Sequence, residues 1–338
     1  MSRPSPAPER DEGEEDCMEI SVVIPTYNRR KIVCRTLETL FAQSVPAPAW
    51  EVIVVVDGST DGTAEAVRAM KPPCRLRVIE QENRGLASAR NTGLGAAEGN
   101  LVLFLDDDML CDRNLVAEHL AFHREVMQAV ALGAIFLSPD SPPSLAAECF
   151  KREIGVFSLR QRGKPDSPIQ VTDCVFGNAS LPREMLAAAG GFDESLRMRE
   201  DLELGLRLFQ RGVCVRHVPG AVAHQFYAKR QRDLIRDVEA FAVADAQLAR
   251  KHPDARNPEH LSYLSAAPLW KRALRRAAAY SPLMADTVLA PVCHLCEALI
   301  QVPALRNLGV RALQIRRRIH WLHRLAELGA LHLTRQRR

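Results

Sequence analysis

The chain has 338 residues with 45 Lys and Arg against 41 Asp and Glu, a net charge of +4, and 47% of its residues are hydrophobic. This length predicts a large α/β domain plus an appendage. Nine scattered cysteines, an odd number, argue against a disulfide framework and for a reducing compartment. The first 17 residues lack a basic head followed by an apolar stretch, so we expect a cytoplasmic protein with a disordered tail at 1–17.

The charge is divided unevenly along the chain. Residues 1–17 carry two Arg against six acids, whereas residues 270–338 carry thirteen Lys and Arg against three acids. Such an asymmetry predicts a basic C-terminal face that meets something anionic.

Four segments in the first third alternate between strand and helix patterns. Apolar, β-branched runs are followed each time by a polar loop and a helical pattern, and they cover residues 19–25, 50–56, 76–80 and 101–105. Successive βα units predict a doubly wound, mostly parallel sheet with right-handed crossovers. The loops at the carboxyl ends of its strands then share one cleft.

The fourth of these strands runs directly into three aspartates, in the sequence LVLFLDDDML from Leu101 to Leu110. In an extended segment alternate side chains share a face, so Asp106 and Asp108 are expected to point one way and Asp107 another. Two convergent carboxylates form a hard oxygen site that suits Mg²⁺ or Mn²⁺. The alternative is a solvated acidic turn.

Other polar residues follow the neighbouring strands at the same edge. Asp57, Arg84 and Arg90 are expected to converge on the aspartates, although singly Asp57 reads as a turn former and Arg90 as a helix-surface charge. Together they favour binding of a nucleoside diphosphate, with carboxylates for the base or ribose and a metal for the phosphates.

The middle of the chain continues the α/β pattern. We expect strands at 129–137, 171–176 and 213–218, and a polar loop at 158–168. Glu200 and Asp201 open a helical pattern, where acids also favour the positive end of the helix dipole. His224 follows an apolar patch, where a structural role is the usual one.

The last third is helical and basic, with helices expected at 231–252, 283–305 and 305–328. The apolar stretch at 283–305 contains charges and prolines, so we reject a transmembrane assignment. The final helix has an apolar face, an arginine-rich face and Trp321 among the arginines, which suits either an anionic membrane surface or packing on the α/β domain. No nucleic-acid recognition fold accompanies the charge.

Seven stretches in this order resemble the family-two glycosyltransferases with the GT-A fold, which is Rossmann-like. The matching stretches are SVVIPTYNR, VIVVVDGSTDGT, ENRGLASARNTGL, LFLDDDM, FGNASLPREMLAAAGGFDE, REDLELGLRLFQRG and AVAH. The resemblance covers about residues 19–227 and implies an enzyme that moves a sugar from a nucleotide-diphosphate donor, expected to be a UDP-sugar, to an acceptor hydroxyl or amine with inversion.

The resemblance also implies roles for individual residues. Asp201 matches the general base, and Asp108 and His224 match ligands of a divalent Mg²⁺ or Mn²⁺ ion. The nucleotide-sugar-binding set that it implies is Pro25, Thr26, Tyr27, Asp57, Asn83, Gly85, Arg90, Asp106 and Asp107. Asn91 matches the segment beside the base and diphosphate, and Val56 stands where the family often has a second acid.

The resemblance divides the chain into a catalytic domain at 18–229 and a helical, basic region at 230–338. The basic, amphipathic final helix would place the protein peripherally on the cytoplasmic membrane face. Two alternatives remain. The chain could be a catalytically degenerate module that docks on a membrane or partner, or a sugar-nucleotide pyrophosphorylase, although its first loop PTYNRRK lacks the glycines expected for that class.

Overall fold

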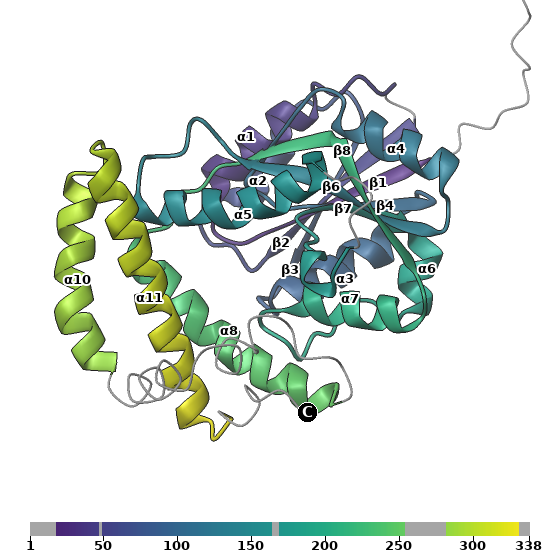
Figure 1. Ribbon diagram of the computed structural model, residues 1–338. Coiled ribbons are helices and arrows are strands. Elements are labelled where there is room, and N and C mark those ends of the chain that lie inside the picture. The colour runs from purple at the N-terminus through teal and green to yellow at the C-terminus, as the bar shows by residue number, and fades with distance from the viewer. Residues whose placement is uncertain (1–17, 47–48, 164–168, 254–281, 331–338) are drawn as a thin grey trace, which may run out of the picture.

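The computed structural model describes residues 18–46, 49–163, 169–253 and 282–330. The expected tail at 1–17 lies outside the described residues. Figure 1 shows a sheet sandwiched between helices, with further helices of the C-terminal third packed to one side.

One eight-stranded sheet forms the centre, in the order β3-β2-β1-β4-β7-β6-β8-β5. Its strands are β1 (Ile20–Thr26), β2 (Trp50–Asp57), β3 (Arg75–Gln81), β4 (Leu101–Leu105), β5 (Met109–Cys111), β6 (Ala129–Leu137), β7 (Asn178–Pro182) and β8 (Cys214–Gln225). Strands β1 to β4 pair in parallel, as do β6 and β8, whereas β5 and β7 pair antiparallel to their neighbours. The predicted α/β fold with a mostly parallel sheet is confirmed.

Two local predictions are wrong. Residues 171–176 do not form a strand: Val171–Asp173 is a short 3₁₀ helix, and the strand in this region is β7. β7 inserts between β4 and β6, a place that the βα alternation gives no reason to expect. The polar segment at 158–168 is helical through Gly163, at the end of α5 (Leu145–Gly163), and its remainder lies outside the described residues.

Helices cover both faces of the sheet, so the strands in the middle are buried from both sides. α1 (Arg30–Leu40), α2 (Thr63–Arg68), α4 (Leu115–Glu125) and α5 pack in one apolar cluster with the sheet. α3 (Leu86–Ala96), α6 (Arg183–Ala188) and α7 (Glu200–Gln210) pack in a second cluster. Burial from both sides explains why β1, β2 and β4 are apolar almost throughout.

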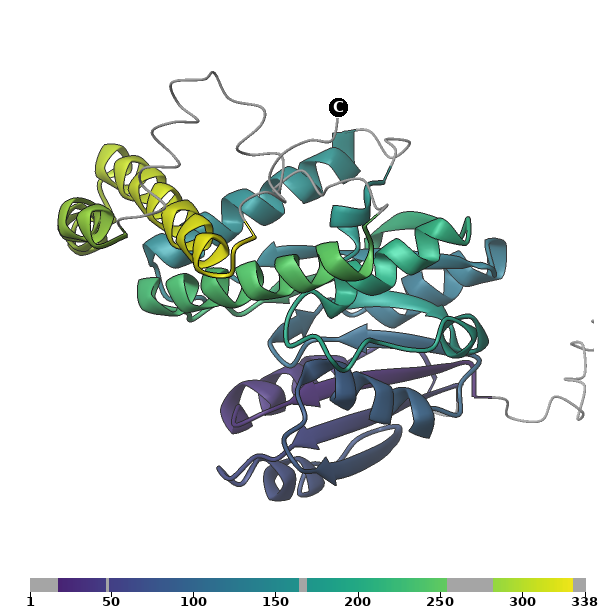
Figure 2. The same cartoon turned by 90° about the horizontal axis from the view of Figure 1, so that it is seen from below.

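The C-terminal helices pack on α5, which covers one face of the sheet. α8 (Gln231–Lys251), α10 (Pro282–Ala298) and α11 (Pro303–Glu327) share a buried cluster with α5. In Figure 2, α8 and α11, in green and yellow, lie above the purple and blue strands of the sheet. A second cluster joins α8 to α11 and includes Trp321, which is buried. Within the described ranges, no helix has the length and apolarity to cross a membrane.

Candidate active site

The aspartate triplet forms a tight turn between β4 and β5, which the backbone N–H of Met109 closes by donating to the carbonyl of Asp106 at 3.2 Å. The expectation of an extended segment is therefore wrong at this point. Asp107 and Asp108 are buried, whereas the Asp106 side chain is 30% exposed. Alternation fails here because side chains share a face at every second residue only in a strand.

One guanidinium joins the two buried aspartates. Arg29 lies 2.9 Å from Asp107 and 2.9 Å from Asp108, and Thr26 donates its hydroxyl to Asp107 at 2.7 Å. Burial raises the pKa of Asp107 to about 7 and also raises that of Asp108, while the charge of Arg29 acts in the opposite direction. Sequence reasoning assigned no role to Arg29, although it ends the first family-like stretch.

A second, fully buried cation links this turn to α7. Arg90 contacts Asp106 at 3.0 Å and Glu200 at 2.9 Å, so it pairs with an acid on each side. Its guanidinium also lies 5.2 Å from the centre of the Phe192 ring. The interpretation of Arg90 as a helix-surface charge is wrong, because the residue is 2% exposed.

At the start of α7, Glu200 is buried and Asp201 is half-buried. Burial raises the pKa of Glu200 to about 7 and raises that of Asp201, and the charge of Arg90 opposes both shifts. An oxygen of Asp201 accepts the N–H of Leu202 at 2.7 Å, a bond of the kind that helix starts favour. The local helix therefore accounts for one oxygen of Asp201.

The loop after β3 is organised by Asp57, at the end of β2. The Asp57 carboxylate accepts the backbone N–H of Arg84 at 2.9 Å and that of Gly85 at 2.8 Å, and the side chain of Gln81 donates to it at 2.8 Å. Gly85 has a positive φ of 94°, which favours glycine. These bonds place Asn83 and Gly85 at the same sheet edge as Asp57, as predicted for a parallel sheet.

The residues at the first loop lie beside the triplet. Pro25 and Thr26 end β1, and Tyr27 follows with half of its side chain exposed. The hydrogen bond of Thr26 to Asp107 connects this loop to the acidic turn. Asn91, in contrast, holds the segment before α7, because its side chain bonds the backbone of Phe192 in both directions, at 2.9 and 2.8 Å.

The observed polar contact of His224 is with Asp112, just beyond β5. It stands opposite Leu110 in the β5–β8 pairing, lies 3.2 Å from Asp112 and stacks at a tilt near Phe136. Asp108 instead receives a hydrogen bond from Gln225 at 3.1 Å. In the described part of the chain, no three His, Cys, Asp or Glu residues group to hold a metal ion.

The acidic turn nevertheless has the chemistry that a hard cation prefers. Its carboxylate oxygens are the ligand type of Mg²⁺ and Mn²⁺, and such ions fill their shells with water and substrate phosphates rather than with protein groups alone. The turn also accommodates a positive charge, because the guanidinium of Arg29 pairs with two of these carboxylates. The residues present therefore fit a cation at this turn.

Two curated relatives share sequence with about seven-tenths of this chain. A validoxylamine A glucosyltransferase of Streptomyces hygroscopicus is 33% identical over 69% of this chain and 61% of its own, and a pre-mycofactocin glycosyltransferase of Mycobacterium tuberculosis is 29% identical over 71% and 49%. The chain thus spans about half to six-tenths of the length of these relatives.

Solved structures share the fold. A mannosyltransferase from Pyrobaculum calidifontis in complex with GDP-Man and Mn²⁺ superposes with a TM-score of 0.59 at 24% identity, over 88% of this chain and 85% of that one. TarS of Staphylococcus aureus in complex with UDP gives a TM-score of 0.51 at 19% identity, over 92% of each chain. The model of glycosyl transferase family 2 matches residues 21–188. With its GT-A fold and the order of its loops at one sheet edge, the chain belongs to glycosyl transferase family 2.

Proposed function

We propose that the protein is a metal-dependent, inverting glycosyltransferase that moves a sugar from a nucleotide-diphosphate donor to an acceptor hydroxyl or amine. One observation carries the proposal. Arg90 pairs with Asp106 and with Glu200, so the turn after β4 and the start of α7 face each other although they are nearly a hundred residues apart in the chain. The relatives are named as glycosyltransferases, and two structural neighbours hold GDP-Man or UDP.

Asp201 is the proposed general base. A base near neutral pH needs a pKa raised toward the working pH, and burial shifts the pKa of Asp201 in that direction. Glu200 beside it shares the buried environment and is neutralised by Arg90. The acceptor's proton passes to the Asp201 carboxylate as the acceptor oxygen or nitrogen attacks the anomeric carbon and the nucleoside diphosphate leaves.

The donor is proposed to lie along the sheet edge between Tyr27 and Asp106. Asp57, Asn83 and Gly85 form the wall on the base side, and Asp106 is the most exposed of the three aspartates. Asp108 is the proposed ligand of Mg²⁺ or Mn²⁺, with His224 as a second ligand. Such an ion supplies charge neutralisation for the departing diphosphate. We expect a UDP-sugar, although one structural neighbour holds a GDP-sugar.

The test is a donor screen followed by turnover. Thermal unfolding is measured with each UDP- or GDP-sugar in the presence of Mn²⁺, because a ligand that binds the folded state raises its apparent stability. Hydrolysis and transfer are then measured for the best donor. Asp201→Asn should abolish turnover and keep the donor-induced thermal shift, whereas Asp237→Asn, at a half-buried position of α8 paired with Lys229, should change neither.

The same measurements separate the alternatives. A degenerate binding module would show a thermal shift without turnover in any variant. A pyrophosphorylase would form the nucleotide sugar from a sugar phosphate and a nucleoside triphosphate, and would release pyrophosphate. Turnover that survives Asp201→Asn unchanged would end the proposed role of this residue.

We further propose an anionic membrane surface as a partner of the α10–α11 hairpin. Seven of the large hydrophobic residues that are exposed in the described structure lie on it, namely Leu283, Val288, Leu295, Leu299, Val302, Leu308 and Ile315. Arg311 and Arg318 are exposed on α11 within the same stretch. A surface that combines apolar and basic side chains suits the interface of an anionic bilayer. Trp321 takes no part, because it is buried against α8.

Vesicle co-sedimentation tests this partner. We expect the full chain to bind vesicles of phosphatidylglycerol and phosphatidylcholine and to release them at high salt. Leu295→Ser with Leu308→Ser should weaken binding, and Met127→Ser, an equally exposed apolar residue elsewhere, should not. Equal binding by the double variant and the unmodified chain would contradict the proposal.

A further inference from the structure

The residue directly before the Glu200–Asp201 pair has an unusual backbone. Arg199 has a positive φ of 67°, a left-handed conformation that few residues other than glycine adopt without cost. Only Asn28 shares this feature among the described residues that are not glycine. A strained turn persists when its surroundings hold it, so the contacts of Arg199 identify what fixes the start of α7.

Those contacts come from the C-terminal helices. The Nε of Arg199 lies 3.1 Å from Oδ1 of Asp245, and its guanidinium lies 4.3 Å from the centre of the Phe241 ring, both on α8. Asp245 is 1% exposed, and its other oxygen accepts the indole N–H of Trp321 from α11 at 2.9 Å. The buried Asp245 carboxylate thus receives one hydrogen bond from Arg199 and one from Trp321. These two bonds connect α11 to the turn that precedes Asp201.

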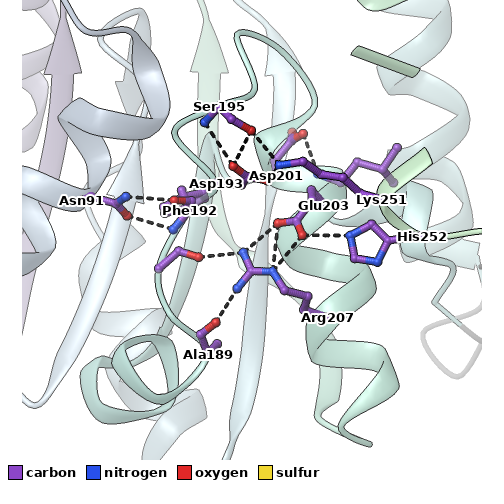
Figure 3. Close-up of polar contacts among 12 residues, drawn as sticks. Asn91, Ala189, Phe192, Asp193, Ser195, Asp201, Glu203, Arg207, Lys251 and His252 are labelled. Carbon is purple, nitrogen blue, oxygen red and sulfur yellow. Dashed lines mark hydrogen bonds and ion pairs between the residues drawn. The ribbon is translucent and has the colours of Figure 1, made fainter. Parts of the chain in front are cut away.

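The end of α8 makes a second set of contacts with the same region, shown in Figure 3. His252 lies 2.9 Å from Glu203 on α7, two residues beyond Asp201. Glu203 in turn pairs with Arg207, whose guanidinium donates to the carbonyl of Gly191 at 2.7 Å. Lys251 pairs with Asp193 in the segment between. The end of α8 therefore contacts both the first turns of α7 and the segment that leads into α7.

We infer that Arg199 and Asp245 are positioning residues for the transfer reaction, through which the C-terminal helices fix the orientation of Asp201. The inference rests on the proposed role of Asp201 as the base. It assigns the C-terminal third a part in the catalytic site in addition to any part in docking. Misplacing a reacting group by a fraction of its working distance costs rate even when the group itself is intact.

The charges around Asp201 make the inference measurable. Arg90 from α3 and Arg199 from its own turn lower the pKa of Asp201, while burial is the largest effect and raises it. Asp106 from the acidic turn and Glu200 beside it are the neighbouring acids, and the thiol of Cys174 faces it from the segment before β7. Loss of the Arg199 charge should therefore move the protonation of Asp201 to higher pH.

Arg199→Gly is the central test, because glycine accepts the left-handed conformation, so the change removes the side chain and its contacts with Asp245 and Phe241 without straining the turn. We expect kcat to fall about tenfold with the KM for the donor nearly unchanged. We also expect the acid limb of the kcat profile, and the titration of the Asp201 carboxyl followed by ¹³C NMR, to move up by about one pH unit. Arg199→Lys should restore part of both.

Asp245→Asn and Trp321→Phe test the contacts by which α8 and α11 hold Arg199. Both should lower kcat more than they change the donor KM, and Asp237→Asn, which removes a paired carboxylate elsewhere on α8, should leave kcat unchanged. An Asp201 titration and a kcat that stay at their original values in Arg199→Gly and Asp245→Asn would overturn the inference. Absence of turnover in the unmodified chain would instead count against the proposed function, and the NMR titration would still decide whether Arg199 acts on Asp201.

Discussion

Replacing Arg90 by Met should lower the free energy of unfolding of the protein. The change keeps a similar length of side chain but leaves Glu200, 4% exposed, without its cation, and Asp106 without its partner. Breaking a buried ion pair by removing one partner costs about 3–5 kcal/mol, because the remaining charge stays buried. We expect a loss of this size in the free energy of unfolding at about pH 8, measured by urea unfolding with circular dichroism.

The loss should depend on pH with a definite sign. The folded-state pKa of Glu200 is raised from 4.5 to about 7, so its protonation favours the folded state below pH 4.5 and that contribution disappears as the pH rises through 7. Without Arg90 the raised pKa moves further upward, and this shift costs at most about 1.4 kcal/mol at pH 8, because the carboxyl becomes protonated once its pKa exceeds the pH. The rest of the expected loss comes from the broken contacts of Arg90 with Asp106 and the Phe192 ring. The variant should therefore come closer to the unmodified chain at about pH 5.5.

Two further variants make this reasoning refutable. Arg90→Met combined with Glu200→Gln should recover part of the lost stability at high pH, since the unpaired charge is gone. Arg68→Met removes an exposed arginine paired with Glu80 and should change stability by less than about 1 kcal/mol. A loss in Arg90→Met that is equal at both pH values, or no larger than that of Arg68→Met, would refute the account.

Three other changes probe separate parts of the molecule. Arg29→Gln frees the Asp107 and Asp108 carboxylates from their shared guanidinium, so Mn²⁺ measured by electron paramagnetic resonance should bind more tightly at about pH 8; weaker binding would mean that Arg29 supports the ion instead. His119 is buried against Asn178, and burial lowers its pKa from 6.5 to about 4. Between pH 6.5 and 4 only the unfolded state gains this proton, so the free energy of unfolding should fall by roughly 3 kcal/mol as the pH drops through that range. The fall should be less steep in His119→Gln. Gly177→Ala would place a methyl group 2.5 Å from an oxygen of Asp106 and should lower turnover at least about tenfold, whereas Gly95→Ala, with open space around it, should keep full activity.

The sequence predicts the first half of the fold well because its signals there are local. Buried parallel strands are continuous apolar runs, and the run from Val52 to Val56 predicts such a strand directly. β7 escapes such reasoning, since Asn178 and Ser180 are polar residues in a fully buried strand. Both are satisfied by buried contacts with His119 from α4, which only the assembled fold supplies. A polar strand of this kind carries no hydrophobic periodicity to read.

The candidate site divides along the same line. Topology brings Asp57, Arg90 and the acidic turn to one edge, as a parallel sheet requires. Which cation pairs with which acid is decided by side-chain geometry, and here Arg29 takes Asp107 and Asp108 while Arg90 takes Asp106. The position of His224 next to Asp112 depends on the register of β8 against β5. Neither choice leaves a trace in residue spacing.

Polar contacts cross the expected boundary at 229/230, where the sequence changes in composition. The family-like stretches end near Tyr227 and a helical pattern begins, yet Asp245 reaches back to Arg199 and Trp321 holds Asp245. Cutting the chain after α8 would leave the Asp245 carboxylate buried without the indole that bonds it, and would uncover the apolar face of α8 that α11 covers. Loss of membrane binding in such a truncation would then be inseparable from damage to the turn of Asp201. Substitutions confined to the exposed face of the hairpin, such as Leu295→Ser, leave that connection in place and so separate docking from catalysis.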